Sequence, residues 1–182
     1  MNQNNRNAIN IHQQILLQPV GLVRSQSKEP VWTKNSGSQD WKQRAAKMKE
    51  QEESLSELII DDRLDGILDG IDDFSHIMVI YWAHLIPEER RHLIRVHPLG
   101  NKDFPLIGVF ATHSPARPNS ILVTVVRLIK REQNILHVTG LDALDGSPIL
   151  DIKPYMQYEN YTEIRIPDWM QEINQEFSEN SV

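Results

Sequence analysis

Apolar residues come in short runs along most of this chain, and turn-forming residues separate the runs. Such runs, rich in β-branched residues, are typical of strands. The run at 76–84 is apolar at nearly every position, so we expect it to be buried on both faces. The pattern predicts strands at 15–25 (with a bend near Gly21), 58–60, 76–84, 93–97, 108–112, 121–131, 135–141 and 149–152.

One segment has helical rather than strand spacing. In residues 38–55 the apolar positions Trp41, Ala45, Met48 and Leu55 recur among Lys, Gln and Glu. Ser38 or Asp40 is placed to cap the start of such a helix. We expect a peripheral amphipathic helix that packs one stripe on the rest of the fold, and the alternative is an arm that faces a partner or an RNA.

The order of these elements favours a mainly β fold. Strands do not alternate with helices, so a barrel is favoured over a doubly wound sheet. The two runs at 121–131 and 135–141 are separated by three residues, which predicts a hairpin. We expect one barrel domain at 15–155, a flexible N-terminal arm at 1–14 and a C-terminal extension at 156–182.

Composition excludes some kinds of site and limits the possible functions. The chain has 182 residues and no cysteine, which excludes disulfides and thiolate metal sites and favours a cytoplasmic location. The N-terminus lacks signal-peptide regions, and the longest apolar run, 74–86, is too short to span a membrane. A net charge of −6 argues against broad nucleic-acid binding but leaves room for a local basic face in the N-terminal third.

Two loops are dense in Pro, Gly, Asp and hydroxyl groups: 108–119 and 140–155. Loops of this kind, held by a rigid sheet, commonly bind ligands, although tight turns at barrel corners have the same composition. The acidic run at 61–73 does not have the spacing of a calcium-binding loop, and the histidines do not form a zinc-binding pair. A dinucleotide-binding glycine motif is also missing. We therefore expect no metal site.

Four stretches together resemble the TsaA-like (TrmO) family of S-adenosylmethionine (SAM)-dependent tRNA methyltransferases. They are PVGLVRS at 19–25, LDGIDDFSH at 68–76 with its continuation to His84, GVFAT at 108–112, and LDGSPILDIKPY at 144–155. The likeness extends over about 18–155. It implies a single-sheeted β-barrel, a homodimer and SAM held near the subunit boundary.

The resemblance also implies which residues contact the cofactor. It places SAM contacts at His84 and Leu85, at His113, at Val123, and at the turn formed by Asp145, Gly146, Ser147 and Pro148. Backbone groups of such a turn can bind the polar ends of SAM.

Three departures from the family pattern change the chemistry of this region. His113 stands where the family has a permanently charged arginine, so a weaker, titratable group replaces a forked donor. RPNSIL at 117–122 lacks a proline and a glycine of the family motif. A Pro-Arg-Gln element expected after the first strand is missing, and EPVW at 29–32 occupies that region.

The function implied by the resemblance is N6-methylation of threonylcarbamoyladenosine beside the tRNA anticodon. His84, Asp142 and Tyr155 are candidate bases for such a reaction, although each also has a plain packing or capping explanation. Two alternatives stay open. The first is methylation of a small molecule or another RNA, and the second is a non-catalytic dimeric SAM-binding module.

Overall fold

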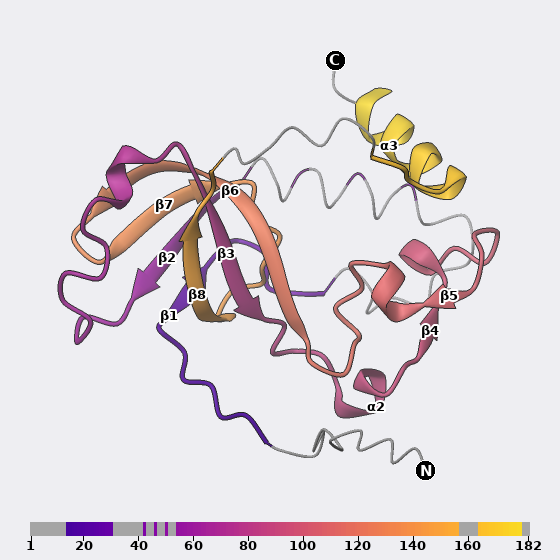
Figure 1. Ribbon diagram of the computed structural model, residues 1–182, viewed down its shortest axis with the longest axis horizontal. Coiled ribbons are helices and arrows are strands. Elements are labelled where there is room, and N and C mark those ends of the chain that lie inside the picture. The colour runs from indigo at the N-terminus through magenta and orange to yellow at the C-terminus, as the bar shows by residue number, and fades with distance from the viewer. Residues whose placement is uncertain are drawn as a thin grey trace, which may run out of the picture.

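The computed structural model describes residues 14–30, 42, 46, 50, 54–156 and 164–179. Within this part of the chain, six strands form a closed barrel in the order β1-β2-β7-β6-β3-β8 (Figure 1). Closure removes exposed sheet edges. The predicted mainly β barrel is therefore confirmed. The barrel strands are β1 (Gly21–Arg24), β2 (Leu55–Ile60), β3 (His76–Trp82), β6 (Ile121–Glu132), β7 (Ile135–Thr139) and β8 (Pro148–Pro154).

The strand pairs are all antiparallel, and the long strand β6 runs between β3 and β7. The predicted hairpin between β6 and β7 is confirmed, and Gln133 at its tip has a left-handed φ of 57°. Irregular registers between Ile80 and Tyr81 and between Leu128 and Lys130 add bends. Such bulges increase the local twist that a small closed barrel needs.

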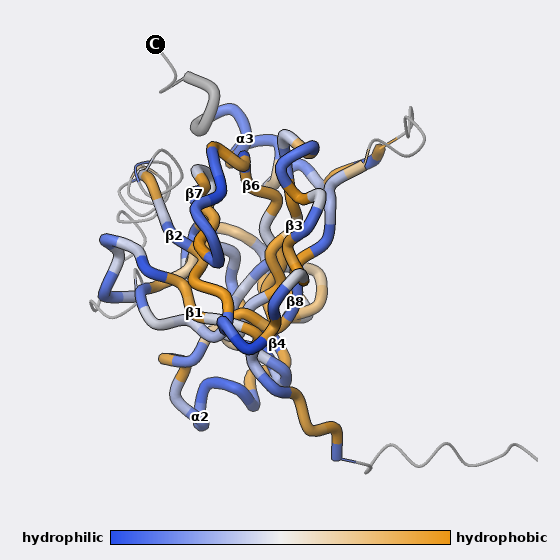
Figure 2. Tube along the Cα trace, turned by 90° about the vertical axis from the view of Figure 1, so that its left-hand side faces the viewer, coloured by the Kyte–Doolittle hydropathy of each residue, from blue (hydrophilic) through white to orange (hydrophobic). Residues whose placement is uncertain are grey.

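The buried core residues come mainly from the barrel strands, and Figure 2 shows hydrophobic residues along these strands. Strand β3 contributes Ile77, Val79 and Tyr81, and the opposite strands contribute further Leu, Ile and Val side chains. Our prediction that 76–84 is buried on both faces was wrong. The strand ends at Trp82, and only its inward face is buried, because the alternate residues point out from a single-layered barrel and are half-buried.

A smaller unit lies beside the barrel. Strands β4 (Arg95–Val96) and β5 (Ile107–Gly108) pair as a two-stranded sheet, and the short helix α2 (Glu88–Arg91) precedes them. The C-terminal helix α3 (Asp168–Glu179) packs here, with Trp169 and Ile173 against Leu99 and Phe104 (Figure 1). The sequence analysis missed this helix. Three single turns of 3₁₀ helix complete the elements: η2 (Ile71–Asp73), η3 (Pro98–Gly100) and η4 (Val109–Ala111).

Several predicted boundaries were wrong. The strands expected at 93–97 and 108–112 are only two residues long, at Arg95–Val96 and Ile107–Gly108. η3 begins at Pro98 after the first, and η4 occupies most of the second predicted range. The first strand begins only at Gly21, and Ile15, Leu16 and Leu17 before it are exposed.

The predicted helix at 38–55 is described only in part. Lys42, Ala46 and Glu50 are helical, and the rest of the segment up to residue 53 lies outside the described residues. Leu55, which we expected to belong to that helix, is the first residue of β2. Pairing with Thr139 of β7 decides this position, because a barrel strand extends for as long as its neighbour offers backbone partners.

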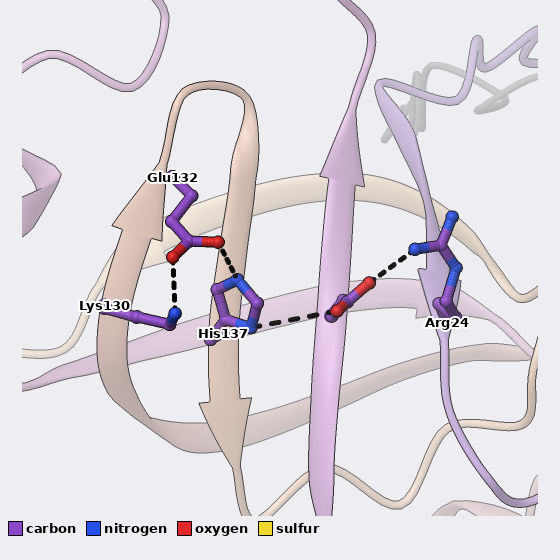
Figure 3. Close-up of polar contacts among 5 residues, drawn as sticks. Arg24, Lys130, Glu132 and His137 are labelled. Atoms are coloured by element: carbon purple, nitrogen blue, oxygen red, sulfur yellow. Dashed lines mark hydrogen bonds and ion pairs between the residues drawn. The ribbon is translucent and has the colours of Figure 1, made fainter.

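A line of four charged side chains and His137 crosses the outside of four barrel strands (Figure 3). His137 of β7 is only 8% exposed, with Nε2 3.1 Å from Glu132 Oε2 and Nδ1 3.9 Å from Glu57 Oε1. Glu132 also accepts a hydrogen bond from Lys130, and Glu57 accepts one from Arg24 at 2.6 Å. The line therefore connects β6, β7, β2 and β1.

In the described part of the chain, no helix is long and apolar enough to cross a membrane.

We predict that Gly21→Ala destabilises the barrel. A Cβ at this position would overlap the backbone oxygen of Ile59 and lie 3.0 Å from Ile60 Cα, so β1 and β2 would have to separate. The expected loss is about 1–3 kcal/mol in the free energy of unfolding, measured by chemical denaturation. Gly108→Ala is the matched control, because a Cβ there meets no atom within 4 Å. Equal stabilities of the two variants would contradict the prediction.

Candidate functional site

The turn between β7 and β8 is hydrogen-bonded to the end of β1 and to the chain that follows it. The amide of Gly146 donates to the Val23 carbonyl at 2.8 Å, and the amide of Asp145 donates to the Ser27 carbonyl at the same distance. In return, the Ser25 amide donates to Asp145 Oδ1 at 3.0 Å. Gly146 has a φ of 77°, a left-handed conformation that favours glycine. These bonds fix the shape of the turn.

His84 lies over this turn. Its Nδ1 atom is 3.3 Å from Ser147 Oγ, and a Cβ placed on Gly146 would be 3.7 Å from its Nε2 atom. His84 comes two residues after β3, whereas Ser147 directly precedes β8. The structure therefore brings together four of the residues that the resemblance implied: His84, Asp145, Gly146 and Ser147.

The turn is less exposed than its Gly-Ser-Pro composition suggests. Ser147 is 1% exposed, and Gly146 alone in the Asp-Gly-Ser-Pro turn is open to solvent. Pro148 begins β8 and pairs with Leu22 of β1. Ser147 and Pro148 thus belong partly to the barrel wall, while Asp145 and Gly146 are at its rim.

Partial burial lowers the pKa of His84 below its usual value, and the nearby charge of Asp145 opposes this shift. At neutral pH the imidazole is therefore uncharged, with one ring nitrogen that donates and one that accepts. A neutral ring beside the turn can bind a polar ligand without repelling a cation.

The three implied contacts outside the turn, other than His84, are all exposed. Leu85 follows His84 and is exposed. Val123 lies on the outside of β6 opposite Ile80, and 53% of its surface is exposed. His113 is exposed in the loop after η4. The hydrogen bonds that assemble the turn include none of these three.

Arg117 organises the loop that carries His113. Its guanidinium donates to the carbonyls of Ser114 (2.8 Å), Val109 (3.3 Å) and Thr112. The Thr112 hydroxyl also donates to the Val109 carbonyl at 2.8 Å. These bonds close η4 and hold His113 at the outside of the loop. The sequence analysis quoted Arg117 only as part of a motif, because a side chain that binds its own loop has no distinctive spacing.

The three candidate bases have different surroundings. Asp142 accepts hydrogen bonds at Oδ1 from the Tyr81 phenol and the Thr124 hydroxyl, each at 2.6 Å. Tyr155 follows the end of β8, and its amide donates to the His76 carbonyl at the start of β3. His84 is beyond the other end of β3, roughly 20 Å away by strand rise. Within one chain, Tyr155 is not brought to the turn.

The acidic run at 61–73 forms ion pairs on the surface. Asp61 pairs with Arg63, which lowers the pKa of Asp61 to about 2. Arg131 of β6 lies 3.5 Å from Asp69 and 3.7 Å from Asp72. Among the described residues, no group of three or more His, Asp or Glu is arranged to hold a metal ion.

Comparison with known proteins identifies the family. The sequence profile described as the tRNA-methyltransferase O N-terminal domain matches residues 40–160. This match extends over more than half of the chain. The chain belongs to the TrmO family.

Curated relatives support this assignment. A protein of Methanothermobacter thermautotrophicus, named "Probable S-adenosyl-L-methionine-binding protein", is 40% identical over 79% of this chain and 92% of its own length. The S-adenosyl-L-methionine-binding protein of Archaeoglobus fulgidus is 38% identical over 78% of this chain and 89% of its own length.

Solved structures agree on the fold. The crystal structure of TrmO from Pseudomonas aeruginosa aligns with a TM-score of 0.59 and 26% identity over 84% of this chain. A second TrmO crystal structure gives 0.60 and 28% over 86%. This chain spans only 62% and 64% of the lengths of those two proteins.

We predict that the His84 imidazole titrates below pH 6.5, the ordinary value for the group, because partial burial disfavours its charged form. A pKa lowered by folding stabilises the native state above the unfolded value, and this contribution is lost as the pH falls through the folded pKa. NMR titration of the ring protons, assigned with His84→Asn, measures the midpoint.

The comparison of wild type with His84→Asn can also be made on the free energy of unfolding. Between pH 7 and pH 5, wild type is expected to lose stability relative to His84→Asn, by less than about 1 kcal/mol because the ring is partly exposed. A titration midpoint above 6.5 would show that the charge of Asp145 dominates over burial.

Proposed function

We propose that this chain binds SAM at the rim of the barrel and transfers its methyl group to tRNA. The observation that carries the proposal is the assembly of His84 with the turn at Asp145, Gly146 and Ser147 in a member of the TrmO family. The names of the curated relatives support SAM as the ligand.

The residues at the turn fit a cationic cofactor. SAM carries a sulfonium and an ammonium group, and the described side chains around the turn are neutral or acidic: His84, Asp145, Ser147 and the nearby Asp142. The exposed backbone of Gly146 offers polar groups for the ribose or amino-acid end. The fit therefore concerns charge and hydrogen-bonding groups.

When bound, SAM supplies an electrophilic methyl group on sulfur. The task of the protein is then to orient the acceptor nitrogen in line with that bond and to exclude water. Backbone bonds from Val23, Ser25 and Ser27 hold the turn rigid for this purpose. His84, with a lowered pKa, is available at neutral pH to accept a proton from the acceptor nitrogen.

The substrate that we propose is adenosine bearing a threonylcarbamoyl group beside the tRNA anticodon, as the family resemblance implies. Such a substrate would place the protein in the cytoplasm. Methylation of a small molecule or another RNA, or SAM binding without catalysis, are the outcomes that would replace this proposal.

We further propose a homodimer. Outward residues of β3 and β6 form neighbouring apolar pairs, Met78 with Val125 and Ile80 with Val123. Val123 and Val125 are exposed in the single chain, which leaves an uncovered apolar strip on the barrel wall. Apolar surface of this kind is commonly covered by a second subunit. Val123 would then lie at the boundary where the resemblance places SAM.

The methyl-transfer proposal predicts that radioactive label passes from methyl-labelled SAM to tRNA that carries threonylcarbamoyladenosine, and not to tRNA without it. Asp145→Ala combined with Ser147→Ala is expected to lower SAM affinity about tenfold, since it removes the carboxylate at the rim and the hydroxyl that contacts His84. Transfer is measured by filter binding and affinity by calorimetry.

The controls separate the alternatives. Circular dichroism checks that the double variant keeps the barrel. SAM binding without transfer of label to either tRNA would contradict the proposed substrate. The absence of a calorimetric binding signal at millimolar SAM would contradict the proposed function itself.

The dimer proposal predicts a light-scattering mass of twice 21.1 kDa at micromolar concentration. Val125→Lys places a charge in the apolar strip and is expected to shift the mass toward that of one chain. Arg127→Lys, an exposed change on the same face that keeps the charge, is the control. A monomer mass for wild type would exclude the dimer under these conditions.

A further inference from the structure

Three polar side chains meet at the inner wall of the barrel. The Tyr81 phenol and the Thr124 hydroxyl each lie 2.6 Å from Asp142 Oδ1, and the two hydroxyl oxygens are 3.4 Å apart. Tyr81 is on β3 and Thr124 on the neighbouring strand β6, whereas Asp142 follows β7. Donors from two neighbouring strands thus fix one carboxylate that comes from the segment after β7.

The direction of the hydrogen bonds is determined by the phenol. Tyr81 is 1% exposed, and burial together with the charge of Asp142 raises its pKa far above the usual range. The phenol is therefore protonated at every working pH and must donate to the carboxylate. Because both donors bind Oδ1, they orient the carboxylate and leave the other oxygen unused.

Asp142 is half-buried, and its second carboxylate oxygen is not fully enclosed. Among the described residues, the buried side-chain nitrogen and oxygen atoms without a hydrogen bond are Ser56 Oγ and His137 Nδ1. Asp142 Oδ2 is not one of them, and it accepts no hydrogen bond from the described chain. A carboxylate whose role was only to satisfy two buried hydroxyls would not need a partly accessible oxygen at the barrel rim.

This carboxylate lies on the same two segments as the candidate site. Tyr81 is three residues before His84, and Asp142 is three residues before Asp145. Ser25 links the two parts of the second segment, since its hydroxyl donates to the Ala143 carbonyl at 3.1 Å and its amide donates to Asp145. Asp142 and the turn therefore form one continuous rim.

We propose that Asp142 binds the cationic end of the methyl donor through Oδ2, and that Tyr81 and Thr124 are positioning residues that hold it there. The inference rests on the proposed function, because it takes SAM as the ligand. A fixed, partly accessible carboxylate attracts a sulfonium or ammonium group strongly, since charge-assisted contacts exceed neutral hydrogen bonds.

The test compares two ligands by calorimetry: SAM, and 5′-methylthioadenosine, which lacks the positive charge and the amino-acid group. Asp142→Asn is expected to weaken SAM binding about tenfold or more and to change methylthioadenosine binding less than about threefold. Asp151→Asn is the matched control, because it removes one carboxylate from β8 that is paired with Lys153. It should leave both affinities unchanged.

Variants of Tyr81 and Thr124 test whether these residues act by holding Asp142 in place. Tyr81→Phe and Thr124→Val remove one donor each and are expected to weaken SAM binding about threefold to tenfold, again with little effect on methylthioadenosine. Thr124→Ser keeps the hydroxyl and should restore SAM binding. If Tyr81→Phe fails to fold, the Thr124 pair decides the matter.

Each outcome has a defined meaning. Equal losses for both ligands in Asp142→Asn, or unchanged SAM affinity, would overturn the role of Asp142 while the proposed function stands. If wild type binds methylthioadenosine but not SAM, or neither, then the proposed function fails, and the role of Asp142 fails with it.

Discussion

Closure of the barrel through the short strand β1 is the constraint on which the rest of the structure depends. β1 has four residues, yet it pairs with β2 on one side and β8 on the other. Bonds between Val23 and the turn extend the pairing with β8 beyond the regular register. The chain that follows, through Ser25 and Ser27, then holds Asp145. Barrel closure and the geometry of the candidate site therefore use neighbouring backbone groups of one segment.

The inside of the barrel combines an apolar core with a polar rim. Deep residues such as Leu58, Val79 and Leu136 are fully buried, and their side chains have no polar atoms that need hydrogen-bond partners. Near the end of β3 the character changes, because Tyr81 carries a hydroxyl that must be paired when buried. Asp142 supplies that partner, and the requirement to satisfy a buried phenol places a carboxylate beside the turn. A packing constraint and the geometry of the candidate site thus coincide.

The outer wall has two distinct regions. Charged pairs from Arg24 to Lys130 cover β1, β2, β7 and the far part of β6 (Figure 3). The wall at β3 and the first half of β6 is apolar at Met78, Ile80, Val123 and Val125. β6 belongs to both regions, so the difference arises from which residues point outward along it and its neighbours, and it distinguishes a face suited to water from a face suited to another subunit.

Local pattern in the sequence determined the barrel class, the β6–β7 hairpin and the main strands, because period and turn residues act over short distances. It also marked the turn at Asp145 and Ser147. The tertiary structure alone decided that Leu55 begins a strand, that 108–112 turns into η4, and that Trp169 and Ile173 form a helix face against Phe104. Each depends on a partner distant in the chain. The same reason explains why Tyr81 and Thr124 escaped notice and why Tyr155 lies far from His84: hydrogen-bond partners across a closed barrel are set by strand order and register, which no local pattern encodes.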